Sequence, residues 1–408
     1  MTRCKIPMLK KIEEAWKIIA SNLPASIVEL SPVLSNQLGL VLGEDVFADL
    51  NMPPFIRSQM DGFAIRLDPT MPNVPLRITG AAEAGAPPSG NLAPGEAWHI
   101  STGAPVPRFT DLVLPIELAR LNDDCTQVSA LLELSLGKNL LGMGEEFKMG
   151  DLLLPKSTVL GPAEYGILAQ AGKTSALLHQ SPRVAIVSTG NELEEPNLMP
   201  GPGHIRNSNG PMLMSQAVRA GCLPRFLGIA RDTPEATEKL LKEGLDHQIL
   251  IISGGVSVGP KDLVRMTLEK LGIDILVHGI SLKPGKPFLF GTNRYGRVVF
   301  GLPGNPVSSF VTFELLVRPA LERIRGLCST TIIPLPAQLS ESWVVTSDRP
   351  LRQPARLNAA PTGWRVSPQK WRGSPDLRSL LGANALVCLE PGKHNLRAGD
   401  SVGVIPLS

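Results

Sequence analysis

Two lysines and two carboxylates stand beside glycine-rich segments in the middle of the sequence. Lys283 and Lys286 enclose a Pro-Gly pair, Glu192 follows Ser-Thr-Gly-Asn, and Asp262 comes shortly after a loop rich in glycine and serine. Lysine ammonium groups bind phosphate or another oxyanion, and Mg²⁺ takes one or two carboxylates together with phosphate oxygens and water. Together these groups predict a metal-assisted phosphoryl or nucleotide site. Each carboxylate also has a structural alternative, because an acid at a helix N-terminus stabilises the helix dipole.

A second candidate for anion binding lies within residues 249–265. Four apolar residues, 249–252, predict a strand that is covered on both faces, as in a parallel sheet. A small-residue loop follows, and Pro260 suits the first position of a helix that carries Asp262 in its first turn. Such a loop exposes backbone N–H groups to an anion at a helix N-terminus. The segment is therefore either a phosphate cradle or only a tight connection between a strand and a helix.

Strands and helices alternate through the centre of the chain. The apolar segments 184–187, 249–252 and 298–300 are predicted strands, and helices are expected over residues 211–220 and from 306 through 325. This order is typical of a parallel, doubly wound sheet, whose binding loops lie at the carboxyl ends of its strands. Three glycine-rich strand ends then share one edge of the sheet, where we place the candidate site.

The flanking segments indicate a multidomain chain. Helices are expected over residues 9–23, which are amphipathic, and over 162–171. Residues 63–136 alternate short apolar runs with turn residues and predict a small all-β domain, whereas residues 327–408 predict a separate β-barrel-like module. A chain of 408 residues is also long enough for three or four domains.

Composition and charge argue against several classes of function. The net charge is only +3 and the basic residues are scattered, so nucleic-acid binding is not expected. The five cysteines form no Cys-x-x-Cys pair, and the six histidines show no zinc-site spacing. With neither a signal peptide nor a long apolar run, the protein is expected to be cytoplasmic and free of membrane segments. No nucleophile, histidine and acid stand out as a trio, which favours chemistry by positioning and charge stabilisation.

Seven short motifs follow one another along the chain: Met60-Asp-Gly-Phe-Ala, Thr102-Gly-Ala-Pro, Ser188-Thr-Gly-Asn-Glu-Leu, Gly203-His-Ile-Arg-Asn-Ser-Asn-Gly-Pro, Ser253-Gly-Gly-Val-Ser-Val-Gly, Lys283-Pro-Gly-Lys-Pro and Gly301-Leu-Pro-Gly-Asn-Pro-Val-Ser. In this order they resemble the MoeA family of molybdopterin molybdenumtransferases, which is related to the E domain of gephyrin. The resemblance covers nearly the whole chain.

The resemblance implies an elongated homodimer with four domains in each subunit. The first domain is discontinuous, over residues 1–50 and 137–180, and a β domain is inserted over 51–136. A central, doubly wound, molybdopterin-binding α/β domain over 181–326 and a C-terminal β-barrel over 327–408 complete the subunit. The implied reaction inserts molybdate into the dithiolene of adenylylated molybdopterin, with Mg²⁺-dependent release of AMP. A pterin adenylyltransferase and molybdoenzyme maturation factors are the implied partners.

Matched motif by motif, the resemblance assigns roles to individual residues. The groups that take part in catalysis would be Asp61, Thr102, Glu192, Asp262, Lys283 and Lys286. Glu192 and Asp262 would be linked to Mg²⁺, and the two lysines would contact the oxyanion and the phosphate. The residues that bind the pterin phosphate, shape the pocket wall or reach in from the last domain would be Ser253, Gly254, Gly255, Ser257, Pro303, Pro306 and Ser374.

Five positions depart from the family pattern. The departures are Phe63 for Tyr, Leu141 for Arg, Glu146 for Asp, Asn191 for Asp, and Gln248 at a position where an acid is common. Leu cannot replace the planar oxyanion donor of Arg, and an amide in place of an acid weakens a cation site. Two alternatives to an active insertase therefore stay open, a non-catalytic pterin-binding or scaffold paralogue and a pterin adenylyltransferase. The choice between molybdate and tungstate also stays open.

Overall fold

The computed structural model of the chain describes residues 9–33, 38–68, 70, 74–86, 90–256, 262–327 and 332–407. Two compact units make up the chain. The first comprises Met1–Gly43, Ser157–Gly161 and Ala176–Ser408, and the second comprises Glu44–Lys156 and Pro162–Ser175. The candidate residues of the central sheet belong to the first unit, whereas Asp61 and Thr102 belong to the second.

A six-stranded sheet forms the centre of the first unit. In spatial order its strands are β17 (Leu223–Ala230), β14 (Arg183–Thr189), β18 (Ile249–Ser253), β21 (Val298–Leu302), β20 (Leu289–Thr292) and β19 (Asp274–His278). The first four strands are parallel and β18 is buried along its whole length, as its apolar sequence predicts. The expectation of a wholly parallel sheet is wrong, since β20 and β19 are antiparallel to their neighbours. The turn between β20 and β21 is short, and a short turn can join only antiparallel strands.

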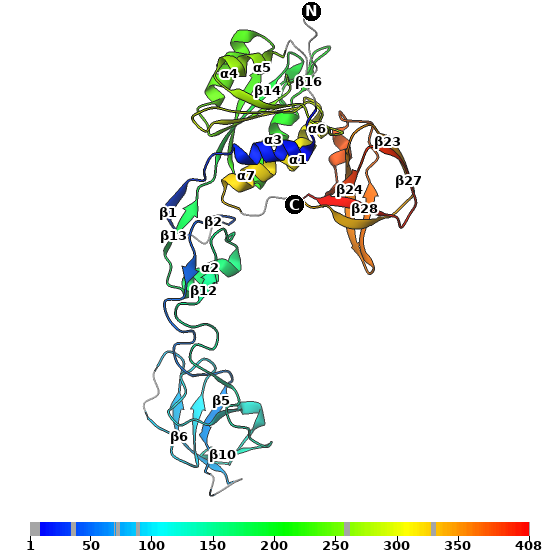
Figure 1. The fold of residues 1–408 in the computed structure, drawn as a ribbon. Coiled ribbons are helices and arrows are strands. Elements are labelled where there is room, and N and C mark those ends of the chain that lie inside the picture. Colours follow the sequence, from blue (N-terminus) through cyan, green and yellow to red (C-terminus); the bar gives the residue numbers. More distant parts are fainter. Residues whose placement is uncertain are drawn as a thin grey trace, which may run out of the picture. The chain divides into compact units, whose positions relative to one another are not determined.

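Helices cover both faces of this sheet, so the doubly wound prediction is confirmed (Figure 1). The helices α4 (Pro234–Gly244) and α5 (Leu263–Lys270) pack on one face, whose core includes Leu250 and Ile252. The other face, whose core includes Ile249 and Ile251, is covered by the remaining helices: α1 (Ile12–Ser21), α3 (Asn209–Arg219), α6 (Pro306–Thr312) and α7 (Arg318–Ile324). Successive residues of β18 thus alternate between the two cores.

Two predicted helix boundaries need correction. The helix expected from Pro260 begins in the described residues at Leu263, because Asp262 caps it instead of lying in its first turn. The long helix expected from residue 306 through 325 is interrupted by a π-helical turn, Phe313–Val317, between α6 and α7. Pro319 lies two residues after this turn, and a proline inside a helix lacks the N–H that the regular ladder requires.

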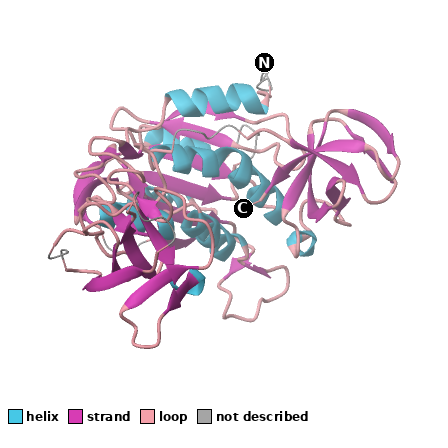
Figure 2. Cartoon of the chain, turned by 90° about the horizontal axis from the view of Figure 1, so that it is seen from below, coloured by secondary structure: helices cyan, strands magenta, loops and turns pink. Residues whose placement is uncertain are grey.

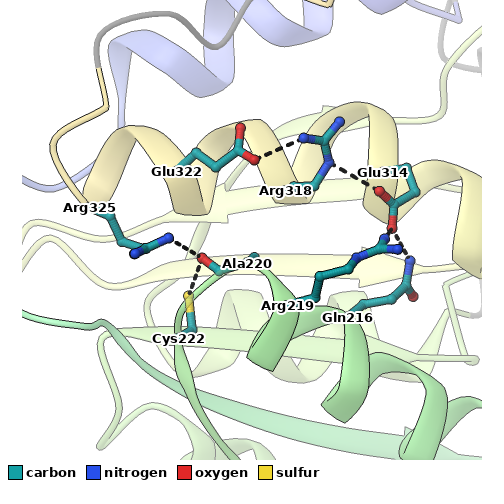
Figure 3. Close-up of polar contacts among 8 residues, drawn as sticks. All are labelled: Gln216, Arg219, Ala220, Cys222, Glu314, Arg318, Glu322 and Arg325. Carbon is teal, nitrogen blue, oxygen red and sulfur yellow. Dashed lines mark hydrogen bonds and ion pairs between the residues drawn. The ribbon is translucent and has the colours of Figure 1, made fainter. Parts of the chain in front are cut away.

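A buried carboxylate fastens α3 to this long helix (Figure 3). Glu314 is fully buried, and it accepts hydrogen bonds from Gln216 at 2.5 Å, from Arg318 at 3.1 Å and from Arg219. Arg318 also donates to Glu322 at 2.8 Å. An isolated buried charge is costly, and here the guanidinium groups of Arg219 and Arg318 both lie against the buried Glu314 carboxylate. The network fixes two helices that both begin beside the sheet edge.

A closed barrel forms the C-terminal part of the first unit, which confirms the predicted β-barrel. Its strands in order are β22 (Leu335–Leu339), β25 (Gly363–Pro368), β24 (Leu351–Ala360), β26 (Ala385–Leu389) and β28 (Ser401–Pro406). A separate pair, β23 (Trp343–Ser347) with β27 (Gly392–Leu396), and the short helical turn η3 (Leu377–Leu380) belong to the same region. In Figure 2 the helices gather around the central sheet, while the barrel consists almost entirely of strands. Leu386 and Ile405 of the barrel extend the core of the central domain.

The second unit contains the predicted inserted β domain. Its six strands in order are β8 (Leu112–Pro115), β5 (Gly62–Arg66), β7 (Glu96–Ile100), β6 (Leu76–Ala82), β10 (Gln127–Ala130) and β9 (Ala119–Leu121), and the turn η1 (Ile116–Leu118) joins β8 to β9. Each face of this sheet carries its own apolar core. The other elements of this unit are β3 (Val46–Phe47), β4 (Arg57–Ser58), β11 (Leu140–Leu141), β12 (Leu152–Leu154) and α2 (Pro162–Gln170).

The remaining elements are small. A three-stranded sheet joins β1 (Val28–Pro32), β13 (Ser175–His179) and β2 (Val41–Leu42), and β15 (Leu193–Glu194) pairs in parallel with β16 (Ile205–Arg206). Residues of both β15 and β16 line the cavity described below. None of the helices in the described part of the chain is both long and apolar enough to cross a bilayer.

Candidate functional site

A cavity of about 1020 Å³ lies at the carboxyl ends of β14, β18 and β21. The residues that follow these three strands line it, among them Gly190, Gly254 and Gly304. The prediction that three glycine-rich strand ends share one edge is therefore confirmed. The volume is sufficient for a ligand the size of a nucleotide or a pterin.

Most of the predicted site residues of the first unit line this one cavity. They are Glu192, Ser253, Gly254, Gly255, Lys283, Lys286, Pro303, Pro306 and Ser374. Asp262 is not among the lining residues. Ser257 lies outside the described residues, and Asp61 and Thr102 belong to the second unit.

The loop after β18 depends on its two glycines. Gly254 has φ +88° and Gly255 has φ +65°, in the left-handed region that side chains rarely enter. A Cβ on Gly254 would stand 2.6 Å from the carbonyl oxygen of Thr189, and a Cβ on Gly255 would stand 2.6 Å from the Thr189 hydroxyl. Only glycine therefore lets this loop lie against the end of β14 and keep its backbone at the cavity wall.

Two lysines supply positive charge to the cavity. Lys283 is held by its backbone, whose N–H donates to Pro350 at 2.9 Å and whose carbonyl accepts from the Arg352 N–H at 2.8 Å. Within the described residues, neither Lys283 nor Lys286 forms an ion pair with a carboxylate. Both lysine side chains therefore line the cavity without a carboxylate partner in the described part of the chain, which suits the binding of an anion.

A third cation, Arg349, lines the same cavity and was missed by the sequence reasoning. It precedes β24 and donates to Asp348 at 3.1 Å and to the Leu282 carbonyl at 3.4 Å. The hydrogen bond from Arg349 is the main reason why the pKa of Asp348 lies below its usual value. No motif marks Arg349, so its place depends on how the barrel packs against the loop that carries Lys283.

The two predicted carboxylates have different surroundings. Glu192 is exposed at the cavity, whereas Asp262 is only 4% exposed and caps α5 by accepting the Arg265 N–H at 2.9 Å. The other oxygen of Asp262, Oδ2, accepts no hydrogen bond in the described part of the chain and lies 4.0 Å from His278 Nε2. Burial raises the pKa of Asp262 above its ordinary value. Asp262 therefore caps α5 through Oδ1, as the helix-dipole alternative suggests, and within the described residues Oδ2 accepts no hydrogen bond.

Two asparagines that line the cavity were also missed as site residues. Asn207 Oδ1 accepts the Gly210 N–H at 3.0 Å and the Ser188 hydroxyl at 3.1 Å. Asn209 Nδ2 donates to the Ser253 hydroxyl at 2.8 Å and to the Gly304 carbonyl at 2.7 Å. Both asparagines belong to the motif that begins at Gly203. Two amide side chains two residues apart in this motif were the sequence signal that could have identified them as site residues.

The barrel closes one side of the cavity through the segment that precedes η3. Ser374 accepts a hydrogen bond from Asn305 Nδ2 at 2.9 Å, and its carbonyl accepts the Val307 N–H at 3.0 Å. Trp371 lines the cavity from the same segment. Ser374 thus connects the barrel to the start of α6, in agreement with the prediction that it reaches in from the last domain.

In the second unit the two remaining candidates contact one another. Asp61 Oδ1 accepts the Thr102 N–H at 2.7 Å, and both residues are exposed. The carboxylate fixes the loop that carries the Thr102 hydroxyl. The pair is a local structure of this unit.

The departures from the family pattern have structural roles. Phe63 is fully buried, with its ring centroid 4.6 Å from that of His99, so a hydroxyl would have no access to solvent there. Leu141 pairs with Arg57 across two strands, and Arg57 forms an ion pair with Glu146 at 2.5 Å. The guanidinium group of Arg57 therefore belongs to the residue paired with Leu141, the position at which the family pattern has arginine.

The departure at Asn191 preserves a turn. Asn191 Oδ1 accepts the Asp232 N–H at 2.9 Å, and its own N–H donates to Asp232 at 3.2 Å. Asp232 itself lines the cavity, and it supplies a carboxylate close to position 191, where the family pattern has aspartate and this chain has asparagine. In the described residues, no group of three or more histidine, cysteine, aspartate or glutamate side chains is placed to hold a metal ion.

Comparison with known proteins decides the family. Residues 10–172 match the MoeA N-terminal region (domain I and II), residues 185–323 match a probable molybdopterin binding domain, and residues 336–407 match the MoeA C-terminal region (domain IV). The molybdopterin molybdenumtransferase of Bacillus subtilis is 32% identical over 393 residues, which cover 91% of this chain and 88% of that protein. The chain belongs to the MoeA family.

Other MoeA relatives agree. The molybdopterin molybdenumtransferase of Staphylococcus aureus is 30% identical over 404 residues, which cover 97% of this chain and 94% of that protein. Two crystal structures of the molybdopterin biosynthesis MoeA protein from Pyrococcus horikoshii share 30% and 26% identity, with TM-scores of 0.80 and 0.81. Each comparison covers 98% of this chain and all of the other. The predicted family and fold class are confirmed, and this MoeA chain is an enzyme of molybdenum cofactor biosynthesis.

Proposed function

We propose that this MoeA chain inserts molybdate into adenylylated molybdopterin and releases AMP in a Mg²⁺-dependent step. The observation that carries the proposal is that Lys283, Lys286 and the Gly254–Gly255 loop line one cavity. Molybdate is a tetrahedral oxyanion, and the adenylylated substrate carries phosphate, so both bind to ammonium groups and to backbone N–H groups. An apolar cleft or a basic groove would not offer this combination.

The residues of the chain position the reactants. The lysines hold negative oxygens, and the glycine loop gives the phosphate a backbone surface without side chains in its way. Two backbone hydrogen bonds to the barrel segment fix the main chain at Lys283, so the side chain extends from a defined point of the cavity wall. The prolines at 303 and 306 restrict the neighbouring loop, which lowers the entropy lost on binding.

Mg²⁺ would be held by Glu192 and Asp262 together with phosphate oxygens of the substrate. Glu192 is exposed at the cavity, whereas Asp262 is not among the residues that line it. Among the described residues, the buried Asp262 Oδ2 has no hydrogen-bond partner, which suits a cation. When bound, the ion would neutralise phosphate charge as AMP leaves. The cap that Asp262 provides to α5 is compatible with this role, because it uses only Oδ1.

The proposal includes Asp61 and Thr102 as active-site groups, Ser257 in the phosphate loop, and a cytoplasmic homodimer. The hydrogen bond between Asp61 and the Thr102 N–H supports a joint role for the two residues. Sedimentation of the purified chain at several concentrations would test the dimer. The proposed partners are a pterin adenylyltransferase, which supplies the nucleotide substrate, and maturation factors that receive the product.

The central experiment mixes purified full-length protein with adenylylated molybdopterin, molybdate and Mg²⁺. AMP release and the reconstitution of a molybdenum-free apoenzyme are followed together. Asp262→Asn keeps an N-cap side chain and removes the carboxylate, and we expect it to lose Mg²⁺-dependent AMP release. Asp274→Asn is the matched control, because Asp274 is exposed at the start of β19 in the same domain and does not line the cavity.

Each outcome decides between the alternatives. AMP release with molybdate that depends on Mg²⁺ supports the insertase, and a parallel run with tungstate decides the choice of metal. Binding of the pterin without AMP release or reconstitution, with either oxyanion, would favour a non-catalytic pterin-binding or scaffold paralogue. Transfer of AMP from ATP to molybdopterin would instead identify an adenylyltransferase. If Asp262→Asn keeps full Mg²⁺-dependent activity, Asp262 serves only as the N-cap of α5 and does not hold the ion.

A further inference from the structure

Asn209 lies between two of the loops that build the cavity. It is the first residue of α3, and only 7% of its surface is exposed. Its Nδ2 donates to the Ser253 hydroxyl at 2.8 Å, at the end of β18, and to the Gly304 carbonyl at 2.7 Å, after β21. An amide nitrogen carries two hydrogens, so both donors are used. One side chain thus fastens the ends of two neighbouring parallel strands.

The orientation of this amide is fixed by its partners. The Gly304 carbonyl can only accept, so the group that faces it must be Nδ2 and not Oδ1. The loops are close at this point, because the Gly254 N–H donates to the Leu302 carbonyl at 3.0 Å and a Cβ on Gly304 would stand 3.7 Å from Gly254 Cα. Asn209 therefore holds the Ser253–Gly254 loop at a set distance from the Gly304 loop.

Asn207, two residues earlier, uses the opposite end of its amide. Its Oδ1 accepts the Gly210 N–H at 3.0 Å and the Ser188 hydroxyl at 3.1 Å. Asn207 is 2% exposed and lines the same cavity. Aspartate could therefore replace Asn207 and keep both hydrogen bonds, whereas at position 209 aspartate would lose both donors and place an oxygen against the Gly304 carbonyl.

We propose that Asn209 is a positioning residue that sets the shape of the phosphate-binding loop through the Ser253 hydroxyl and the Gly304 carbonyl. This inference rests on the proposed function, because it assigns the loop to the phosphate of adenylylated molybdopterin. Asn209 acts on the ligand through the loop, so its loss lowers the affinity of the cavity more than the rate of the chemical step. The requirement is for two N–H donors at this position, which aspartate, serine and alanine do not provide.

The test compares Asn209→Asp with Asn207→Asp in the full-length protein. Both variants add one negative charge to the cavity and neither changes side-chain size, so they differ in which hydrogen bonds survive. Binding of adenylylated molybdopterin is measured by titration, kcat and KM of AMP release are measured in parallel, and thermal melting reports the fold. We expect affinity to fall at least tenfold further in Asn209→Asp than in Asn207→Asp, with kcat values of the two variants within about threefold.

The possible results separate this inference from the proposed function. A wild-type chain that does not bind the ligand would overturn the proposed function and this inference with it. If the wild type binds and the two variants have equal affinity, only the inference fails. A lower melting temperature for Asn209→Asp with unchanged affinity in its folded fraction would assign the residue a purely structural role. Should Asn209→Asp not fold, Asn209→Ala, which adds no charge, is compared with Asn207→Asp in the same titration, and the same tenfold difference is required.

Discussion

The two sides of the cavity are built from different kinds of groups. On the side of the central domain, the backbone of the glycine loops after β14, β18 and β21 forms much of the wall, and Lys283 and Lys286 supply the cations. On the barrel side, Arg349, Trp371 and Ser374 reach in from segments between strands. The first side is made by local backbone conformation and the second by the packing of one domain on another, so the two should respond differently to substitution.

The largest expected difference concerns the cations. Replacing Lys283 or Lys286 with alanine should lower kcat/KM for AMP release by roughly 30- to 160-fold, since a hydrogen bond to a charged group contributes about 2 to 3 kcal/mol. Arg349→Ala should lower kcat/KM for AMP release only about tenfold, because the Arg349 guanidinium group already donates a hydrogen bond to Asp348. The three variants are compared with the wild type under identical conditions. A loss for Arg349→Ala equal to that of the lysines would show that the barrel side is as important for the anion as the central domain.

The next difference concerns glycines on the two sides. Gly254→Ala should lower the free energy of unfolding by about 2 to 3 kcal/mol, because φ is +88° and a Cβ would stand 2.6 Å from the Thr189 carbonyl oxygen. Gly373 on the barrel side also has positive φ, at +105°, but the nearest atom to an added Cβ is 3.8 Å away. Gly373→Ala should therefore lower the free energy of unfolding by only about 1 kcal/mol. Urea unfolding measures both, and equal costs would contradict the distinction.

A smaller effect tests the cap at the start of α5. Asp262→Ala should destabilise the protein by about 1 kcal/mol, because the Arg265 N–H loses its acceptor. Asp262→Asn should remain within a few tenths of a kcal/mol of the wild type, since asparagine caps helices as well as aspartate does. Urea unfolding without Mg²⁺ keeps this measurement independent of any metal. Equal destabilisation by both substitutions would mean that the charge, and not the cap, is what α5 requires.

The smallest effect tests the contact that joins the two sides. Asn305 donates to Ser374 at 2.9 Å across the boundary between α6 and the barrel segment. A double-mutant cycle with Asn305→Ala and Ser374→Ala should give a coupling energy of about 0.5 to 1 kcal/mol. Substitution of Ser342, which is exposed in the barrel far along the chain from this segment, supplies the control pair with Asn305. A coupling of zero for Asn305 and Ser374 would mean that the barrel side does not hold the start of α6.

Much of the fold could be predicted because its signals are local. The run at 249–252 identifies a strand buried on both faces, and the glycines after it mark the loop, since few other residues adopt positive φ. Lys283 and Lys286 were found because charged residues in a glycine-rich and proline-rich loop have few structural uses. The antiparallel strands β19 and β20 were not expected, because a short apolar segment does not record the direction of its neighbour.

Other parts of the site were beyond local reasoning. Arg349 has an ordinary sequence context, and only the pairing of Lys283 with the segment before β24 brings it to the cavity. Asp262 was expected to face the cavity with Glu192, but the start of α5 turns its carboxylate into a cap. Asn209 was noticed only as part of a motif, and its role depends on two partners that are 44 and 95 residues away in the chain.

The sequence by itself determined the family, the alternation of strands and helices, and the glycine loops at the sheet edge, because apolar periodicity and backbone conformation are properties of neighbouring residues. The tertiary structure alone decided which carboxylate faces the cavity, which cation joins the two lysines, and which side chain fastens the loops. Those outcomes depend on distances between residues that are far apart in the chain, and burial and hydrogen bonding fix such distances only when the domains pack.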